Sequence, residues 1–168
     1  MKKEVIKDLL KDIFFAIVIV IVLINYVLIP CVVEGSSMYD TLHENDYGYS
    51  FIFTRKIAIN RFDIAVIMTG SDMSSKLLVK RVIGLPNETI EYKDNRLYVN
   101  GEYVEEDFLK EVTTGDFTAV LSDDEYFCLG DNRNVSRDSR FYGPFSGDKI
   151  VSTHLFVIYP LSSIGFKK

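Results

Sequence analysis

The sequence predicts an all-β fold, a domain of mostly antiparallel strands behind one N-terminal transmembrane helix. Three observations support this prediction. A long uncharged run lies near the N-terminus, no later stretch sustains a 3.6-residue apolar period, and alternation with a period of two recurs after Val33. A chain of 168 residues has room for one such anchor and one modest domain.

Composition excludes several classes of protein. Apolar residues make up 48% of the chain and charged residues 26%, which is typical of a packed fold and not of a disordered chain. The net charge of −5 argues against nucleic acid as a partner. Two cysteines, Cys31 and Cys128, and two histidines are too few for a disulfide framework or a structural metal site. We therefore expect neither a metal nor another cofactor.

The run of residues 13–33 is predicted to be a membrane anchor. It carries no charged residue, and as a helix it would span about 31 Å, against about 30 Å for the hydrocarbon core of a bilayer. Lysines precede the run and acidic residues follow it, so residues 1–12 are expected to form a cytoplasmic tail. Residues 34–168 would then lie outside a cell membrane that the chain crosses once.

A cleavable signal peptide is the alternative interpretation of this run. Signal peptides have an apolar stretch of about 7–15 residues and small residues around the cleavage site. Here the apolar stretch is longer, and it ends at residues 28–33 in Leu-Ile-Pro-Cys-Val-Val without such a pattern. An uncleaved anchor is therefore favoured, with the lipid bilayer as a partner.

Short segments after the anchor are predicted to be strands. The Asn100-Gly101 pair favours a tight hairpin, because both residues accept positive φ at little cost. Residues 86–124 are expected to form a small β excursion from the core, since they contain the least apolar region. The strands expected are Ile64–Met68, Leu77–Ile83, Thr89–Tyr92, Arg96–Val99, Glu102–Val104, Tyr126–Leu129 and Ser152–Tyr159.

Two cations interrupt the predicted strand of residues 77–83. On a strand, Lys80 would share one face with Leu78 and Val82, and Arg81 would lie on the other face. Burial favours the neutral form of an amine and lowers its pKa, which makes lysine a usable base. The alternative is that Lys80 reaches out to solvent from a sheet edge.

Residues 34–42, rich in glycine and serine, follow the anchor. Ser37 could act as a nucleophile only with a base within hydrogen-bond distance. His43 lies in a polar turn and His154 in a predicted strand, so neither completes a Ser/His/Asp triad. A third segment, residues 130–140, combines three cations, two acids and two serines in eleven residues. From composition alone it could equally be a solvated charged loop.

These three segments, in this order behind one anchor, resemble type I signal peptidases, also called leader peptidases, in the short bacterial form with a single span. Residues 37–42, Ser-Met-Tyr-Asp-Thr-Leu, are similar to the family's Ser-Met-x-Pro-Thr-Leu box. Residues 80–86, Lys-Arg-Val-Ile-Gly-Leu-Pro, are similar to its lysine box. Residues 130–140 match Gly-Asp-Asn-Arg-x-x-Ser-x-Asp-Ser-Arg at every specified position.

The resemblance implies a membrane-bound serine endopeptidase that removes N-terminal signal peptides from exported preproteins through an acyl-enzyme. Ser37 would be the nucleophile and Lys80 the general base. Ser136 would orient the amine of Lys80. Three other polar side chains at box positions would form a supporting ion-pair network with Arg81, namely Asp131, Asp138 and Arg140. Met38, Leu42 and Val79 are candidates for the lining of the substrate pocket because they adjoin the dyad in sequence.

The sequence departs from the family pattern at three positions. Asp40 replaces the usual proline, which we expect to change turn rigidity and not activity. Phe62-Asp63 stands where Gly-Asp is common, and Gly35 stands where some relatives place a second oxyanion hydroxyl. Whether the substrates are general secretory cargo or a dedicated client stays open.

Two other functions share part of the pattern. Some relatives encoded with surface pili have lost the dyad and act in polymer assembly, but this chain retains both Ser37 and Lys80. Self-cleaving repressors also use a Ser/Lys dyad. They carry a cytoplasmic DNA-binding module instead of an anchor, and no segment here resembles such a module.

Overall fold

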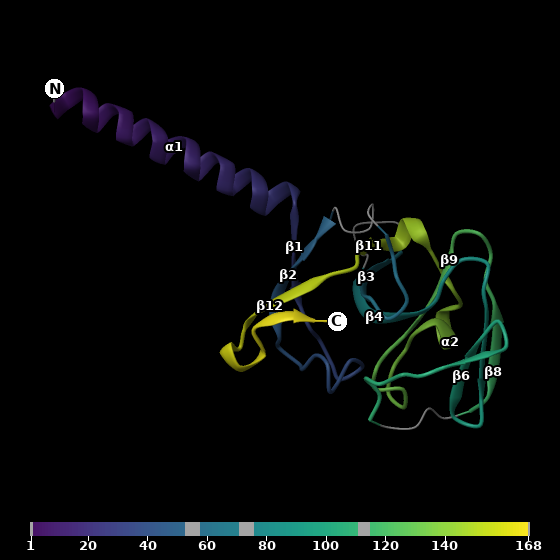
Figure 1. Ribbon diagram of the computed structural model, residues 1–168. Helices are drawn as coiled ribbons and strands as arrows, with labels where there is room; N and C mark the ends of the chain where they lie inside the picture. The colour runs from purple at the N-terminus through teal and green to yellow at the C-terminus, as the bar shows by residue number, and fades with distance from the viewer. Residues whose placement is uncertain (1, 53–57, 71–75, 111–114, 168) are drawn as a thin grey trace.

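The computed structural model describes residues 2–52, 58–70, 76–110 and 115–167. Helix α1 (Lys2–Tyr26) projects away from a body of three β-sheets (Figure 1). Every pairing between the described strands is antiparallel, so the predicted mostly antiparallel β architecture is confirmed.

The first sheet has the order β1-β2-β12-β13, with β1 at Leu28–Val32, β2 at Tyr47–Phe51, β12 at Leu155–Tyr159 and β13 at Gly165–Lys167. The second has the order β10-β9-β4-β3-β11, with β10 at Phe145–Ser146, β9 at Glu125–Leu129, β4 at Lys76–Gly84, β3 at Ile64–Thr69 and β11 at Ile150–Ser152. The third has the order β7-β6-β5-β8, with β7 at Glu102–Val104, β6 at Arg96–Val99, β5 at Thr89–Lys93 and β8 at Phe117–Val120. Three short helical segments complete the described elements: α2 at Ser139–Tyr142, η2 at Gly147–Lys149 and η3 at Leu161–Ser163.

The sequence predicted a helix over the whole uncharged run of residues 13–33. That prediction is wrong, because only the first part of the run is helical. Helix α1 ends at Tyr26, and the next residues form strand β1, which pairs with β2. Pro30 explains the change, because proline lacks an N–H group and interrupts a helix but is tolerated on an edge strand. Among the described residues, no helix combines the length and the apolar composition needed to cross a membrane.

Most of the predicted strands are present, within about two residues of the expected ends. The single strand predicted at residues 152–159 is wrong, because β11 and β12 belong to different sheets. β11 pairs with β3, and β12 pairs with β2. His154 lies between these two strands, where the chain passes from the second sheet to the first. Its carbonyl oxygen accepts a hydrogen bond from Ser50 Oγ of β2 at 2.5 Å, which holds this connection against the first sheet.

The third sheet contains the hairpin that the sequence predicted. Asn100 and Gly101 have φ values of 51° and 84°, which is the turn geometry that suits the right-handed twist of the flanking strands. Asp94 and Asn95 adopt the same left-handed region, at 50° and 60°, between β5 and β6. Both turns follow from residues that tolerate positive φ.

Strand β3 lies at the centre of the packing because its two faces contact different apolar clusters. Ile64 and Val66 pack toward the first sheet, together with Met38 and Leu42. Ala65 and Ile67 pack toward the other face of the second sheet. A third cluster joins the second and third sheets through Ile83, Ile90, Tyr92, Leu97, Val99, Leu121, Phe127 and Leu129. The segments that carry the candidate site are therefore held by three adjoining cores.

Candidate active site

Ser37 lies on the turn segment between β1 and β2. Met38 and Leu42 anchor this segment, since both are buried in the cluster that joins the first two sheets. The backbone N–H of Leu42 donates to the carbonyl oxygen of Met38 at 2.8 Å, which tightens the turn. Ser37 itself stays partly exposed. Packing on either side of a tight turn thus presents its hydroxyl at the surface of a cleft.

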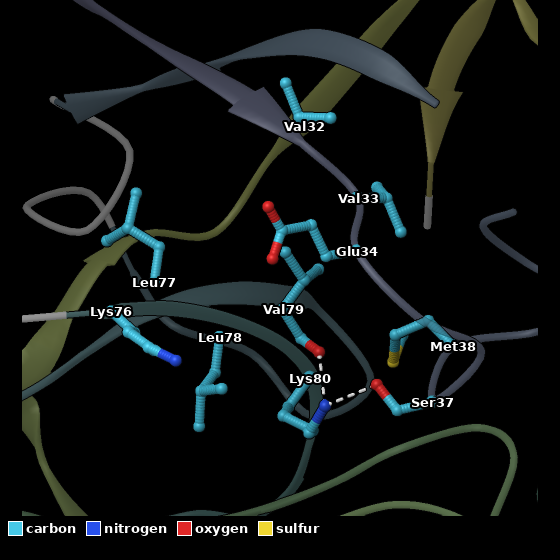
Figure 2. A pocket seen from close by; sticks show the side chains of 10 residues that line it. All are labelled: Val32, Val33, Glu34, Ser37, Met38, Lys76, Leu77, Leu78, Val79 and Lys80. Atoms are coloured by element: carbon cyan, nitrogen blue, oxygen red, sulfur yellow. Dashed lines mark hydrogen bonds between the residues drawn. The ribbon is translucent and has the colours of Figure 1, made fainter. Parts of the chain in front are cut away.

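Lys80 reaches the same cleft from β4. Its neighbours Leu78 and Val82 pack on the apolar cluster beside it, as the predicted strand faces require. The side chain is buried, with only 3% of its surface exposed, so the alternative of a lysine reaching out to solvent is wrong. Lys80 Nζ lies 2.6 Å from Ser37 Oγ and 3.0 Å from the carbonyl oxygen of Val79 (Figure 2).

Burial changes the acidity of Lys80. Desolvation lowers its pKa from 10.5 to about 8, against the opposing attraction of the carboxylates of Asp138 and Asp131. About a tenth of the amine is therefore neutral at pH 7, against well under a thousandth for an ordinary lysine. A neutral amine can accept the proton of the neighbouring hydroxyl, whereas an ammonium group can only donate.

The segment of residues 130–140 backs the turn that carries Ser37. A Cβ atom on Gly130 would collide with Ser136 Oγ and with the carbonyl oxygen of Ser37, so only glycine fits. The N–H of Asn132 donates to that same carbonyl oxygen at 3.1 Å. The backbones of the two segments are thus in direct contact behind the hydroxyl.

A buried ion pair joins the three box segments. Arg81 Nε and Nη2 donate to the two carboxylate oxygens of Asp131 at 2.8 and 2.7 Å, and each side chain is only 2% exposed. Thr41 Oγ1 donates to the same carboxylate at 2.5 Å. Removing one partner of such a pair typically costs about 3–5 kcal/mol, because the other charge is left buried alone. The pair therefore fixes the lysine strand against the other two segments.

Asp138 forms a second, separate ion pair with Arg140, at 2.8 Å between Oδ2 and Nη2. Its side chain also caps α2 and accepts the N–H of Gly130 at 3.1 Å. Burial raises the pKa of this carboxyl, but the hydrogen bonds from Arg140 and Gly130 outweigh it and hold the pKa below its ordinary value. The predicted network thus consists of two separate ion pairs, Arg81–Asp131 and Arg140–Asp138.

Two predicted residues lie elsewhere than expected. Ser136 Oγ is buried, and it is not among the hydrogen-bond partners of Lys80 Nζ, so the expected bond to Lys80 is not formed. The carbonyl oxygen of Val79 takes that position instead. Leu42 is fully buried beneath the site and does not line the cleft.

At Asp40 and Phe62, where the sequence departs from the family pattern, the backbone adopts a positive φ. Asp40 has a φ of 82°, which the ring of proline cannot adopt, so the turn differs in shape from one built on proline and not merely in rigidity. Phe62 has a φ of 71°, a left-handed conformation that glycine adopts more easily. The sequence shows which residues differ from the pattern, but not the backbone that they require.

A cleft of about 530 Å³ contains both candidate catalytic groups. Met38 and Val79 line it as expected (Figure 2). Two strand edges flank it: β1 is the edge of its sheet, and residues 76–80 of β4 pair only with β3 among the described strands. Sequence reasoning missed the other lining residues, Val32, Val33, Glu34, Lys76, Leu77 and Leu78, although their position beside the two boxes could have indicated them.

Comparison with known proteins identifies the family. The model of the family described as signal peptidase, peptidase S26, matches residues 6–159. Signal peptidase I S of Bacillus subtilis (strain 168) is 37% identical over 177 residues, which covers 97% of this chain and 94% of that protein. Signal peptidase I V of the same organism is 43% identical over 152 residues, which covers 81% of this chain and 89% of that protein.

A solved structure agrees with this relationship. The crystal structure of a signal peptidase I from Enterococcus faecalis V583 matches with a TM-score of 0.50 at 36% identity, over 57% of this chain and 96% of that chain. The fold and the family together define a serine peptidase, a hydrolase of peptide bonds. This chain belongs to the signal peptidase family, peptidase S26.

Proposed function

We propose that this protein removes signal peptides from exported preproteins with a catalytic dyad of Ser37 and Lys80. The observation that carries the proposal is the 2.6 Å contact between Ser37 Oγ and a buried Lys80 Nζ whose pKa is about 8. General base catalysis needs an acceptor within hydrogen-bond distance and with a pKa near the working pH. Lys80 meets both conditions.

The proposed reaction proceeds through an acyl-enzyme. Ser37 Oγ attacks the scissile carbonyl carbon while Lys80 Nζ takes the hydroxyl proton and then gives it to the departing amine. Water, deprotonated by the same amine, then attacks the ester and releases the product. The N–H of Ser37 donates to no described group and is the natural donor to the oxyanion. Asp131, Asp138, Arg81 and Arg140 act as supporting residues that hold the segments in place.

The cleft suits an extended peptide. The free edges of β1 and β4 offer backbone hydrogen-bond groups on both sides, and a bound strand can pair with such edges. Met38 and Val79 then provide an apolar floor near the dyad, which favours small side chains beside the scissile bond. We propose that the signal peptide binds here as an added strand.

We also propose that α1 attaches the protein to a bilayer, with the β body on the extracytoplasmic side. Apolar side chains cover α1 from Ile13 to Ile24, and all of the large ones are exposed. An exposed apolar surface of this extent on a projecting helix is typical of contact with lipid. Lysines near the N-terminal end favour the cytoplasmic side for that end.

Cleavage of a preprotein tests the proposal. The full chain in detergent or vesicles should release the mature protein, and mass spectrometry should place the cut after the signal peptide. Ser37→Ala and Lys80→Ala should each reduce the rate by at least about a thousandfold, because each removes one member of the dyad. Ser36→Ala, next to the nucleophile, is the matched control and should retain activity. A wild-type protein as inert as Ser37→Ala would contradict the proposal.

A further inference from the structure

The segment of residues 106–110, here called the strap, follows β7 and contacts all three box segments. Its alternate residues do so in turn. Glu106 forms an ion pair with Arg133, Phe108 stacks on Arg81, and Lys110 forms an ion pair with Asp40. The strap is thus a short, continuous piece of chain that contacts the turn of Ser37, the strand of Lys80 and the segment of residues 130–140.

Glu106 holds the segment of residues 130–140. Its Oε1 lies 2.5 Å from Arg133 Nη2, and the two side chains are 8% and 0% exposed. Arg133 Nε donates to the carbonyl oxygen of Gly130 at 3.0 Å. Arg140 Nη2 donates to the carbonyl oxygen of Arg133 at 2.6 Å. The buried pair of Glu106 and Arg133 therefore holds Gly130 in place through the hydrogen bond from Arg133. Gly130 in turn lies directly against the carbonyl oxygen of Ser37.

Phe108 covers the ion pair beside Lys80. Its ring centroid lies 4.1 Å from the guanidinium carbon of Arg81, within the range of a cation–π contact. The ring of Phe62 packs edge-on against it, at 5.1 Å between centroids. Phe62 has a φ of 71°, and its carbonyl oxygen accepts a hydrogen bond from Arg81 Nη1 at 2.8 Å. Phe108 thus supports both Arg81 and a strained backbone position.

Lys110 makes the weakest of the three contacts. Its Nζ lies 3.1 Å from Asp40 Oδ1, but Lys110 is 71% exposed, and exposed pairs typically contribute less than about 1 kcal/mol. This contact reaches the turn of Ser37 three residues after the nucleophile. We therefore assign the main effect of the strap to Glu106 and Phe108.

We infer that Glu106 and Phe108 are positioning residues that set the geometry of Ser37 and Lys80; this inference rests on the proposed function. None of the strap residues lines the cleft, so they do not bind substrate there. The two candidate catalytic groups lie 43 positions apart in the chain and meet at 2.6 Å. Loss of the strap contacts should therefore reduce kcat and leave KM unchanged.

Steady-state kinetics of the full chain test this inference. Phe108→Leu and Glu106→Gln should each reduce kcat at least about tenfold, because small misplacements of reacting groups are costly. KM should change less than about twofold, and thermal unfolding should show that the variants are folded. Phe108→Tyr should restore kcat because it keeps the aromatic ring over Arg81. Asp107→Asn, an exposed neighbour in the strap that makes none of these contacts, is the matched control.

Hydrogen exchange gives a readout that is independent of cleavage. The amide of Asn132, which donates to the carbonyl oxygen of Ser37, should exchange faster in Phe108→Leu and Glu106→Gln than in the wild type or Asp107→Asn. Unchanged kcat and unchanged exchange in folded variants would overturn the inference. If the wild type cleaves no preprotein but the two variants still exchange faster than it does, the effect of the strap on the Ser37 turn is supported and only the proposed function is contradicted.

Discussion

Lys80 is a buried cation without a carboxylate in direct contact among the described residues. Its two hydrogen-bond partners are neutral oxygens, Ser37 Oγ and the carbonyl oxygen of Val79. The nearby charges of Asp131 and Asp138 are engaged by Arg81 and Arg140. Neither aspartate therefore compensates fully for the loss of solvation, and the pKa of the amine stays below its ordinary value.

The pKa of Lys80 predicts the pH dependence of cleavage. The logarithm of kcat/KM should rise with pH below about 8 and level off above it, as the amine loses its proton. Initial rates between pH 6 and 10 on one preprotein measure this. Lys80→Arg is the control: it keeps a cation but does not deprotonate, so it should be inactive at every pH. A plateau that already begins at pH 6 would contradict the assignment.

The same burial should cost stability. The pKa of Lys80 in the folded protein, about 8, lies below the ordinary value of 10.5. Between these values the folded protein binds fewer protons than the unfolded chain, so its stability rises with pH. Below about pH 8 the penalty is complete, at up to about 3 kcal/mol. Lys80→Met, which is neutral, should therefore raise the free energy of unfolding at pH 7.

Urea unfolding at pH 7 and at pH 10 measures this stability difference. The advantage of Lys80→Met over the wild type should shrink at the higher pH, where the wild-type lysine is also largely neutral when folded. An equal difference at both values would show that packing and not charge is responsible. Val79→Leu, a neutral change at the neighbouring position, should show no such dependence on pH.

At the scale of elements, the turn after Ser37 depends on a left-handed residue. Asp40→Pro should destabilise the protein by about 2–3 kcal/mol and abolish cleavage, because proline fixes φ near −65° where the chain requires 82°. Asp40→Gly, which suits this backbone, should change stability by less than about 1 kcal/mol. Thermal unfolding of both variants checks this. An Asp40→Pro protein as stable as Asp40→Gly would refute the proposed role of the turn.

The elements that could be predicted from sequence are those with a local signal. Strands β5 and β6 show period-two alternation, β3 is a continuous apolar run of strand length, and the Asn100-Gly101 turn has residues that tolerate positive φ. Strand β1 could not be predicted, because its apolar residues continue the apolar run of α1 and the sequence does not show where the helix ends and the strand begins. Strand β13 is only three residues long, at Gly165–Lys167, too short for a periodic pattern.

The candidate site could be predicted only in part, for a related reason. Ser37 and Lys80 were found through resemblance, because their contact joins residues 43 positions apart. The strap gave no signal, since Glu106 and Phe108 are an ordinary acid and an ordinary aromatic residue until folding brings them to Arg133 and Arg81. The expected hydrogen bond between Ser136 and Lys80 is not formed because it depends on the orientation of the serine side chain. The position of a residue in a sequence motif does not specify that orientation.

At the scale of the whole molecule, the proposed attachment predicts that α1 contacts lipid and that the β body does not require it. Removal of residues 2–26 should release the protein from membranes, because it removes the exposed apolar side chains of α1 while the body keeps its own three buried apolar clusters. Carbonate extraction should leave the full chain in the membrane pellet and the shortened chain in the supernatant. Circular dichroism of the shortened chain should retain the β signal. A full chain found in the supernatant would contradict the proposed attachment.

Introduced charges give a second test on the intact chain. Ile17→Asp combined with Val20→Asp should weaken membrane binding, since a charge in lipid is expensive. Lys3→Gln, a change outside the apolar part of α1, should leave the protein in the pellet. Retention of the double variant at wild-type levels would contradict the proposal that the apolar part of α1 contacts lipid.

The junction between α1 and β1 consists of one residue, Val27. Strand β1 then rises about 16 Å before the chain reaches the wall of the cleft. Under the proposed attachment of α1 to a bilayer, the length of this one strand would set the distance between the lipid and the hydroxyl of Ser37. A substrate whose own apolar stretch ends at a different depth would present the wrong bond for cutting.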